Sequence, residues 1–246
     1  MTTLVVLQPS YIPWLGFFDQ VRRSDYFVYY DDAQYDKHGW RNRNRIKAAA
    51  GPVWLTVPVR TRGRMGQQIN EVEIANGTPW ARKHLKSIEE AYARAPHCAA
   101  YLSPLAELLG RHWERLAELD IAVCKLMCSW FGLDRPMVRA SELEIEGDRN
   151  DRLLAFCQHF GADTYLSGDA ARSYLDVGLF SAHGIRVEWQ NFQHPEYPQQ
   201  HGLFVSHLSA LDLVLNVGDQ CAAVLARAGR NETSHIVGPV GKFPED

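Results

Sequence analysis

Two short apolar runs, with a face of helical spacing between them, organise the amino-terminal part of the chain. Leu4–Leu7 are four consecutive apolar residues ended by Gln8–Pro9, a pattern typical of a buried strand. Pro13 suits the first turn of a helix, and apolar residues continue at mostly helical spacing: Trp14, Leu15, Phe17, Phe18 and Val21. A second run, Tyr26–Tyr30, predicts another strand and leads into Asp31–Asp32. If the strands are parallel, the polar groups after both lie at one sheet edge, where open α/β sheets bind ligands.

The rest of the chain continues to alternate between strand-like and helix-like patterns. Residues 41–47 and 52–59 predict a hairpin around the turn Ala48–Gly51. Thr78 and Pro79 form a helix-start signal, and helical spacing then dominates as far as Gly132, which predicts a helical insertion at about 79–133. Further strands are predicted at Glu71–Ile74, Pro136–Ala140, Thr164–Leu166 and Arg186–Trp189, and further helices at 152–160 (capped by Asn150 or Asp151), at Ser209–Val217 and on through Ala228.

These elements predict an α/β protein with a mainly parallel central sheet and a helical insertion. We expect one domain over residues 1–229, because no internal repeat or low-complexity tract interrupts the pattern, and a flexible tail at 230–246. The order strand, PW-x-G turn, helix, strand is similar to the adenylate-binding core of nucleotidyltransferases and class I synthetases. Those enzymes carry an HxGH-type motif at this turn, whereas this chain has Pro13–Gly16 there. We therefore expect their nucleotide-binding architecture without their reaction.

The composition is that of an ordinary globular protein, with 246 residues of which 46% are hydrophobic and 22% charged. No run of eighteen apolar residues occurs, and the first five residues carry no basic region, so neither a membrane span nor a secretory signal is expected. The five cysteines include Cys124 and Cys128 in an apolar helical run, where core thiols are expected and not a metal pair. A reducing cytoplasm is the expected compartment.

Positive charge is concentrated in one segment. Residues 22–64 contain ten Arg or Lys and four Asp, a net charge of +6, although the whole chain has a net charge of −3. On a strand, Arg41, Arg43, Arg45 and Lys47 share one face, which is expected to look toward bulk water or toward an anion. Two interpretations stay open: a solvated edge strand guarded by charge, and a phosphate clamp. The sequence does not rank Arg41, Arg43 and Arg45 as phosphate ligands, and Arg43 is chosen because it is central. A nucleotide is favoured over a nucleic acid, because the protein is acidic overall and the basic stretch is short.

Four residues are candidates for a general base, and common catalytic and metal motifs are absent. The sequence contains no GxxxxGK[ST], GxGxxG, GxSxG or HExxH, and no His and Cys pairs at metal spacing. Asp31 and Asp32 are candidates because adjacent carboxylates repel, so that one of them titrates upward toward neutrality. Alternation along an extended chain puts them on opposite sides, so only one is expected to face a cleft. His201 and His207 are the histidines with the best claim to the same role.

Other polar and aromatic side chains are candidates for binding. Contacts to sugar hydroxyls, amides, bases or rings are assigned to Gln8, Tyr11, Trp14, Gln34, Tyr35 and Asn44. Core packing is the alternative for Trp14, and a packed position is the better interpretation of His84. Ser167 and Gly168 follow a predicted strand, where backbone N–H groups meet phosphate, although Ser-Gly also serves as a simple turn. We expect one cleft to be approached from the second half of the chain by Ser167, Gly168 and His207, and to be lined by Gln8, Tyr11, Asp31, Asp32, Gln34, Arg43 and Asn44.

Several stretches together carry a resemblance to a known family. QPSYIPWLGFFDQV, DYFVYYDDAQY and WRNRNRIK resemble the opening of the WbqC-like family of bacterial proteins. WLTVPV at 54–59, YLSG at 165–168 and HLSALDLVLNVG at 207–218 agree with it, so the resemblance covers nearly the whole chain. It implies a place in O-antigen or polysaccharide biosynthesis, where some members are linked to acylating an amino sugar, for instance with glycine.

The function that the resemblance implies is acyl or aminoacyl transfer to the amine of a nucleotide-linked amino sugar. No tightly bound cofactor is expected, and the co-substrate is an acyl-CoA, an aminoacyl-tRNA or ATP; tRNA as donor is the one nucleic acid expected. Two other functions stay open: a nucleotide-dependent ligase or nucleotidyl-type enzyme on an adenylate-binding fold, and a non-catalytic nucleotide-sugar-binding protein. The sequence leaves the donor, the sugar and the oligomeric state open.

Overall fold

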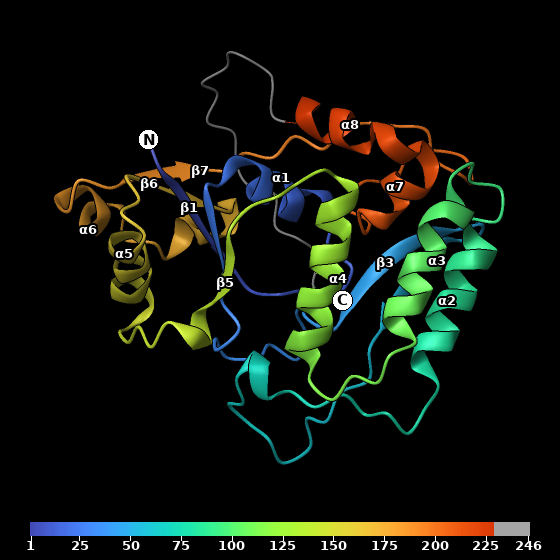
Figure 1. Ribbon diagram of the computed structural model, residues 1–246, viewed down its shortest axis with the longest axis horizontal. Coiled ribbons are helices and arrows are strands. Elements are labelled where there is room, and N and C mark those ends of the chain that lie inside the picture. Colours follow the sequence, from blue (N-terminus) through green and yellow to red (C-terminus); the bar gives the residue numbers. More distant parts are fainter. Residues whose placement is uncertain (229–246) are drawn as a thin grey trace.

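A five-stranded parallel sheet in the order β5-β2-β1-β6-β7 forms the centre of the computed structural model, which describes residues 1–228 (Figure 1). Its strands are β1 (Thr3–Leu7), β2 (Tyr26–Tyr29), β5 (Met137–Arg139), β6 (Thr164–Ser167) and β7 (Arg186–Trp189). A separate antiparallel hairpin pairs β3 (Arg43–Ala48) with β4 (Gly51–Thr56). The predicted α/β class is confirmed, and so is the parallel pairing of β1 with β2.

The chain reverses its direction across the sheet next to β1. From β1 it moves to β2 and β5 on one side, and it then returns to place β6 and β7 on the other side. Residues along β1 alternate between two cores: Val5 packs with the cluster that contains α1, whereas Leu4 and Val6 pack with the cluster that contains α5. The carboxyl ends of β1 and β6 therefore form the switch point, the place where open α/β sheets bind ligands.

Helices cover both sides of the sheet (Figure 1). Helices α5 and α6 lie at one end of the molecule, and α2, α3 and α4 stand with β3 at the other end as the predicted helical insertion. The α-helices are α1 (Leu15–Arg23), α2 (Trp80–Ala91), α3 (Cys98–Leu109), α4 (Leu116–Trp130), α5 (Arg149–His159), α6 (Val177–Ala182), α7 (Leu211–Val217) and α8 (Cys221–Arg227). Short 3-10 turns occur at Ile69–Glu71, Ala140–Glu142, Asp169–Ser173 and Gly218–Gln220. Within the described chain, no helix has the length and apolar character needed to cross a membrane.

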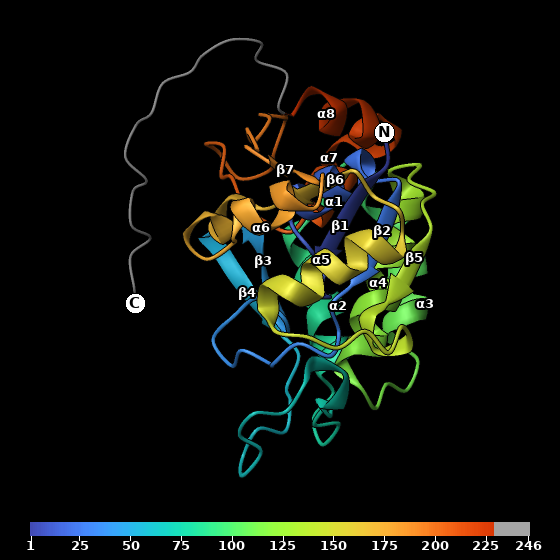
Figure 2. The ribbon, with the colours of Figure 1, turned by 90° about the vertical axis from the view of Figure 1, so that its left-hand side faces the viewer.

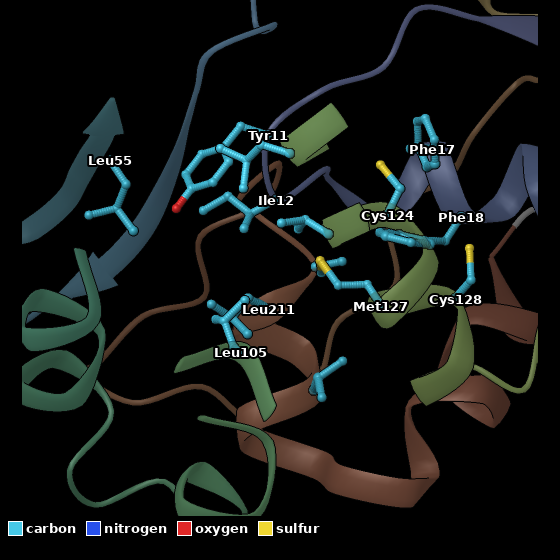
Figure 3. Close-up of a cluster of buried hydrophobic side chains, with 14 of the residues drawn as sticks. Tyr11, Ile12, Phe17, Phe18, Leu55, Leu105, Cys124, Met127, Cys128 and Leu211 are labelled. Atoms are coloured by element: carbon cyan, nitrogen blue, oxygen red, sulfur yellow. The ribbon is translucent and has the colours of Figure 1, made fainter. Parts of the chain in front are cut away.

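The larger hydrophobic cluster joins the turn after β1 to the helical insertion. Figure 3 shows Tyr11 and Ile12 from that turn, Phe17 and Phe18 from α1, Leu55 from β4, and side chains from α3, α4 and α7 in one cluster. Cys124 and Cys128 are buried there without a disulfide, which confirms the expectation of core thiols. This packing fixes the turn that follows β1 at the switch point.

Some predicted boundaries are wrong for local reasons. Glu71–Ile74 is not a strand; a 3-10 turn occupies its start, and Glu73 and Ile74 form single bridges to two different segments. Helix α5 begins at Arg149, because the Asp148 side chain accepts hydrogen bonds from the N–H groups of Asn150 and Asp151, the two residues predicted as caps. Helix α2 begins at Trp80 without a side-chain cap, so the predicted cap at Thr78 is also wrong. The predicted tail at 230–246 lies outside the described residues.

Residues 41–47, which we call the basic arm, alternate between inward and outward side chains as predicted, except near the hairpin turn. Asn42, Asn44 and Ile46 point inward and are buried. The expectation that all four cations face water or an anion is wrong for Lys47, which is 2% exposed. Its Nζ donates to Gln199 Oε1 at 3.1 Å and to the Leu203 carbonyl at 2.5 Å, because the segment before α7 covers this end of β3.

Asn44 provides a test of how the hairpin is attached. Its Nδ2 donates to the Ile12 carbonyl at 3.0 Å, and its Oδ1 accepts from the Arg45 N–H at 2.8 Å. Asn44→Ala should lower the free energy of unfolding by about 2–3 kcal/mol, because both bonds are lost and a buried carbonyl is left unpaired. Thr56→Ala, at an exposed position of β4, should cost about 0.5 kcal/mol or less in the same denaturant titrations. A near-neutral Asn44→Ala would show that the hairpin is held mainly by other contacts.

Candidate functional site

The residues that follow the strands meet at one edge of the sheet. The pairing of Leu7 with Tyr29 brings Gln8 to the same edge as Asp31–Asp32, and the Tyr30 N–H donates to the Leu7 carbonyl at 2.8 Å. Ser167 ends β6 beside β1, and Gly168 follows it. We call this region the carboxyl edge.

Asp31 is held inside the protein by a cation and a hydroxyl. It is fully buried, and its carboxylate accepts from Arg139 Nε at 2.7 Å, from Ser141 Oγ at 2.8 Å and from the Ser141 N–H at 3.0 Å. These contacts tie the end of β2 to the end of β5. Both oxygens of the carboxylate are therefore engaged by donors of the scaffold.

Asp32 turns toward α5 and makes a bidentate ion pair. Its oxygens contact Arg152 Nη1 at 3.0 Å and Arg152 Nη2 at 2.5 Å. The guanidinium also lies over the rings of Tyr30 and Phe156. Both side chains keep a small exposed fraction, 15% for Arg152 and 12% for Asp32. This ion pair therefore borders the carboxyl edge, and both oxygens of the Asp32 carboxylate are bound by Arg152.

Two of the predicted binding residues belong to the scaffold in this arrangement. Tyr11 is fully buried, and its hydroxyl lies 3.0 Å from His84 Nδ1 (Figure 3 shows the Tyr11 ring within the core). Burial lowers the pKa of His84 to about 4, so this histidine is neutral and packed. Asn44 is 2% exposed, and its side-chain amide donates to a backbone carbonyl, that of Ile12. Gln34, by contrast, is exposed, and its backbone forms an isolated β-bridge with Gln68.

Aromatic rings and arginines gather on the outward face of the hairpin and on the segment before α7. Arg43 lies 4.7 Å from the Trp54 ring centre, and Arg45 lies 5.5 Å from the ring centres of both Trp40 and Trp54. The exposed fractions are 42% for Trp40 and 44% for Trp54. Arg45 joins this hairpin to the segment before α7, because its carbonyl accepts from the Ser209 N–H at 2.9 Å and its charge acts on His207. We call these residues the aromatic–cationic face: Trp14, Trp40, Arg43, Arg45, Trp54, His194 and His207.

Histidines form the inner part of this face. His207 stacks on Trp14, with ring centres 5.3 Å apart, and lies 5.3 Å from the ring of His194. Burial lowers the pKa of His194 to about 4. Partial burial and the charge of Arg45 lower the pKa of His207. Both rings are therefore neutral near pH 7, and a neutral imidazole can accept a proton.

The segment that carries these histidines is fixed by a buried carboxylate. Asp212, at the start of α7, accepts from Tyr92 at 2.7 Å, from Tyr197 at 2.9 Å and from Gln199 Nε2 at 2.7 Å. His201, the other candidate base, contacts the Ala91 carbonyl through Nε2 at 2.7 Å and so is engaged with the backbone. His207 adopts a φ of 58°, a conformation rare for a non-glycine residue, which the surrounding contacts must hold.

Glycine at position 16 permits the position of Trp14. A Cβ atom on Gly16 would lie 2.2 Å from the indole of Trp14, so a larger residue would displace the ring on which His207 stacks. The Phe192 ring packs edge-to-face against the same indole, with ring centres 5.1 Å apart. Phe192 follows Gln190, whose N–H donates to the Ser167 carbonyl. Residues 190–192 thus link Ser167 of the carboxyl edge to Trp14 of the aromatic–cationic face, and Figure 2 shows β3 and β4 of the hairpin side by side.

Arginines of the basic arm differ in how much of their hydrogen-bonding capacity remains. Arg41 Nη1 donates to the Gln8 carbonyl at 3.3 Å. Arg43 donates to the His38 carbonyl at 2.6 Å and to the Gly39 carbonyl at 3.3 Å. Arg45 has a buried Nε without a hydrogen-bond partner among residues 1–228. Arg45 is thus the member of the set with an unused N–H donor among the described residues.

Sequence reasoning missed several residues of the site. Trp40, Trp54 and His194 are not distinguished by spacing, because their neighbours come from other segments. Two surface hollows, of about 320 Å³ beside Trp80 and about 340 Å³ along residues 59–64, are lined by neither the carboxyl edge nor the aromatic–cationic face. Within residues 1–228, no group of three or more His, Cys, Asp or Glu could hold a metal ion.

Asp31 should act on stability. Asp31→Asn should lower the free energy of unfolding by about 2–4 kcal/mol, because it weakens charge-assisted bonds and leaves Arg139 without its counter-ion. Glu90→Gln removes an exposed ion pair with Lys86 on α2 and should change stability by about 0.5 kcal/mol or less. Urea titrations of both variants measure this. An Asp31→Asn protein of wild-type stability would show that Asp31 is not needed to hold the end of β2 to the end of β5.

Comparisons with known proteins agree with this arrangement of motifs. A family model described as the WbqC-like protein family matches residues 8–223, which span the switch point, the hairpin and the helical insertion. The chain is 39% identical over 220 residues to the uncharacterized protein Rv1507c of Mycobacterium tuberculosis (strain ATCC 25618 / H37Rv), which covers 89% of this chain and 95% of the relative. No solved structure matches the chain. From the match over most of its length, the chain belongs to the WbqC-like protein family.

Proposed function

We propose that this protein is an enzyme that binds a nucleotide-linked amino sugar and transfers an acyl or aminoacyl group to its amine. The observation that carries the proposal is the contact set of Arg45, which lies over two exposed indoles and beside His207. An indole offers a stacking surface to a base or sugar ring, and a guanidinium offers hydrogen bonds to phosphate oxygens. The face thus combines the groups that a nucleotide-sugar requires with a neutral imidazole.

The proposed substrate is a small nucleotide derivative. The carboxyl edge supplies Gln8 for sugar hydroxyls and the backbone of Ser167–Gly168 for phosphate. The net charge of −3 disfavours an extended nucleic-acid surface. Five free, buried cysteines fit a reducing cytoplasm, where nucleotide-sugars are made.

The reaction needs a base that removes a proton from the amine. The amine nitrogen attacks the carbonyl carbon of the acyl donor, its proton passes to the base, and the donor's thiolate or alkoxide leaves and regains a proton. His207 is the proposed base, because its pKa is lowered and its Nδ1 lies 2.8 Å from Ser206 Oγ, which orients the ring. Asp31 and Asp32 already engage Arg139 and Arg152, so we assign them to positioning the edge. The acyl donor in this proposal is an acyl-CoA or an aminoacyl-tRNA.

The strand order favours a second candidate, a ligase or nucleotidyl-type enzyme that uses ATP. Doubly wound sheets with a switch point beside the first strand bind nucleotides in many enzymes. This candidate requires activity that depends on ATP and Mg²⁺, whereas transfer from a preformed acyl donor does not. A thermal-shift screen with ATP, CoA and nucleotide-sugars separates the two, because a ligand at 100 times its Kd stabilises by about 2.7 kcal/mol. Binding of a nucleotide-sugar without turnover with any donor would indicate a binding protein.

Arg45 should contribute mainly to nucleotide binding. Arg45→Gln keeps the backbone contacts of β3 and removes the charge, so it should weaken binding of the nucleotide-sugar selected by the screen by about 1.5–3 kcal/mol. Isothermal titration measures the change. Arg62→Gln, at an exposed position outside the face, is the matched control and should leave the affinity unchanged. Equal affinities for wild type and Arg45→Gln would remove this face from the nucleotide site.

His207 should contribute mainly to turnover. His207→Gln should abolish transfer while nucleotide-sugar binding persists, because the side chain keeps its polarity and loses its basicity. In the wild type the rate should fall as the pH drops through the lowered pKa of His207, so the acid limb should lie below about 6.5. A pH–rate profile of wild type and variant tests both statements. A wild-type profile flat down to about pH 4, or full activity of His207→Gln, would contradict the assignment.

A further inference from the structure

Three arginines from two segments of the chain surround a single carboxylate. The oxygens of Glu73 lie 2.9 Å from Arg64 Nη1, 3.7 Å from Arg60 Nε and 3.7 Å from Arg115 Nη1. Arg64 also donates a hydrogen bond to this carboxylate at 3.1 Å, which lowers the pKa of Glu73 and keeps it ionised. One negative charge thus meets three positive charges, so that an excess of two positive charges remains. We call Arg60, Arg64, Glu73 and Arg115 the arginine cluster.

Backbone hydrogen bonds hold the segments of the arginine cluster side by side. The Arg60 N–H donates to the Glu73 carbonyl at 2.9 Å, and Glu73 forms an isolated β-bridge with Arg115. The Arg64 N–H donates to the Thr61 carbonyl at 3.1 Å, which closes the turn between Arg60 and Arg64. Exposed ion pairs contribute little stability by themselves. The main chain therefore holds these like charges together, and the arrangement exists before any ligand binds.

A surface hollow of about 340 Å³ shares two arginines with this cluster. Arg60, Arg62 and Arg64 line it together with Val59 and Thr61, so the described lining contains three cations and no acid. It also contains no aromatic ring on which a base could stack. In Figures 1 and 2 the loop that follows β4 projects from the body of the molecule. The hollow is therefore a positively charged site, and an added anion must supply the missing counter-charge.

The loop of the arginine cluster is anchored to the residues that follow β2. The Tyr35 N–H donates to the Gln67 carbonyl at 2.9 Å, and the Asn70 N–H donates to the Asp31 carbonyl at 2.8 Å. The acid of this stretch, Glu71, is engaged with its own turn, because its carboxylate accepts from the Gln68 N–H at 2.8 Å. The hollow is thus tied to the chain that leaves the carboxyl edge, although residues of the edge do not line it.

We propose that the arginine cluster and its hollow bind an oligophosphate, a chain of linked phosphates that ends in a free phosphate. A guanidinium fork matches phosphate oxygens, and neighbouring arginines can each bind a different phosphate. Pyrophosphate and tripolyphosphate concentrate more negative charge than orthophosphate or the diphosphate diester of a nucleotide-sugar. They therefore match the excess of positive charge best. The ligand is the free anion or the tail of a nucleoside triphosphate, since the lining recognises phosphates alone. Binding here does not depend on the transfer reaction proposed above.

The first test is isothermal titration of the wild-type protein at low ionic strength, where surface charges are least screened. Inorganic pyrophosphate and tripolyphosphate should bind, and orthophosphate should bind at least tenfold more weakly than tripolyphosphate. A short single-stranded RNA without a terminal phosphate should also bind at least tenfold more weakly, because its charge is spread along the chain. No binding of either oligophosphate, or equally tight binding of orthophosphate or of the RNA, would overturn the proposal.

ATP distinguishes the two sources of the oligophosphate in the same titrations. ATP that binds at least as tightly as tripolyphosphate assigns the site to the tail of a nucleoside triphosphate. ATP that binds more weakly assigns it to the free anion.

The second test locates the binding site with matched arginine variants. Arg64→Gln should lose at least fivefold in affinity for tripolyphosphate and keep the melting temperature of the wild type, because its ion pair is exposed. Arg111→Gln removes another exposed arginine that is paired with a glutamate, Glu107, and should change neither quantity. Arg60→Gln gives an independent loss of affinity if Arg64→Gln does not fold. Wild-type affinity in Arg60→Gln and Arg64→Gln, or an equal loss in Arg111→Gln, would overturn the proposal.

Discussion

The turn from Gln8 to Trp14 is the constraint on which the rest of the structure depends. Strand β1 is paired on both sides, so the chain must leave the sheet at its carboxyl end through this turn. Hydrogen bonds from distant segments then fix it: the Tyr11 N–H donates to the Arg41 carbonyl, Asn44 donates to the Ile12 carbonyl, and the Ala210 N–H donates to the Pro13 carbonyl. Hairpin, sheet and α7 therefore share one anchoring point, and displacement of this turn would move both the carboxyl edge and the aromatic–cationic face.

Charged groups around this point are used in two different ways. Asp31, Asp32 and Asp212 each have complete sets of donors and hold elements together. Arg45 and Asp120 keep unpartnered polar atoms in the described part of the chain, although burying such atoms is costly. Satisfied groups explain how the fold is maintained, and unsatisfied groups indicate where an added molecule would improve the balance of hydrogen bonds.

The two ends of this turn contact different parts of the proposed nucleotide-sugar site. Trp14, at its end, contacts His207 and so belongs to the nucleotide-sugar position. Gln8, at its start, lies at the carboxyl edge, and its carbonyl accepts from Arg41. A switch point makes this possible, because the connections after β1 and β6 leave on opposite faces and open the edge between them.

Local sequence pattern determined the elements, since periodicity depends only on near neighbours. The apolar runs of β1 and β2 mark buried strands, and alternation in the basic arm correctly turns Asn42 and Asn44 inward. Family membership is also visible in the sequence, because its motifs are contiguous. Tertiary structure alone decided which charges are paired, since the partners are remote: Arg139 lies 108 positions after Asp31, and the carbonyl that receives Lys47 belongs to Leu203. The periodicity of a strand or a helix predicts which way a side chain points. The residues that it contacts there come from distant segments, and their packing is not encoded in the local pattern.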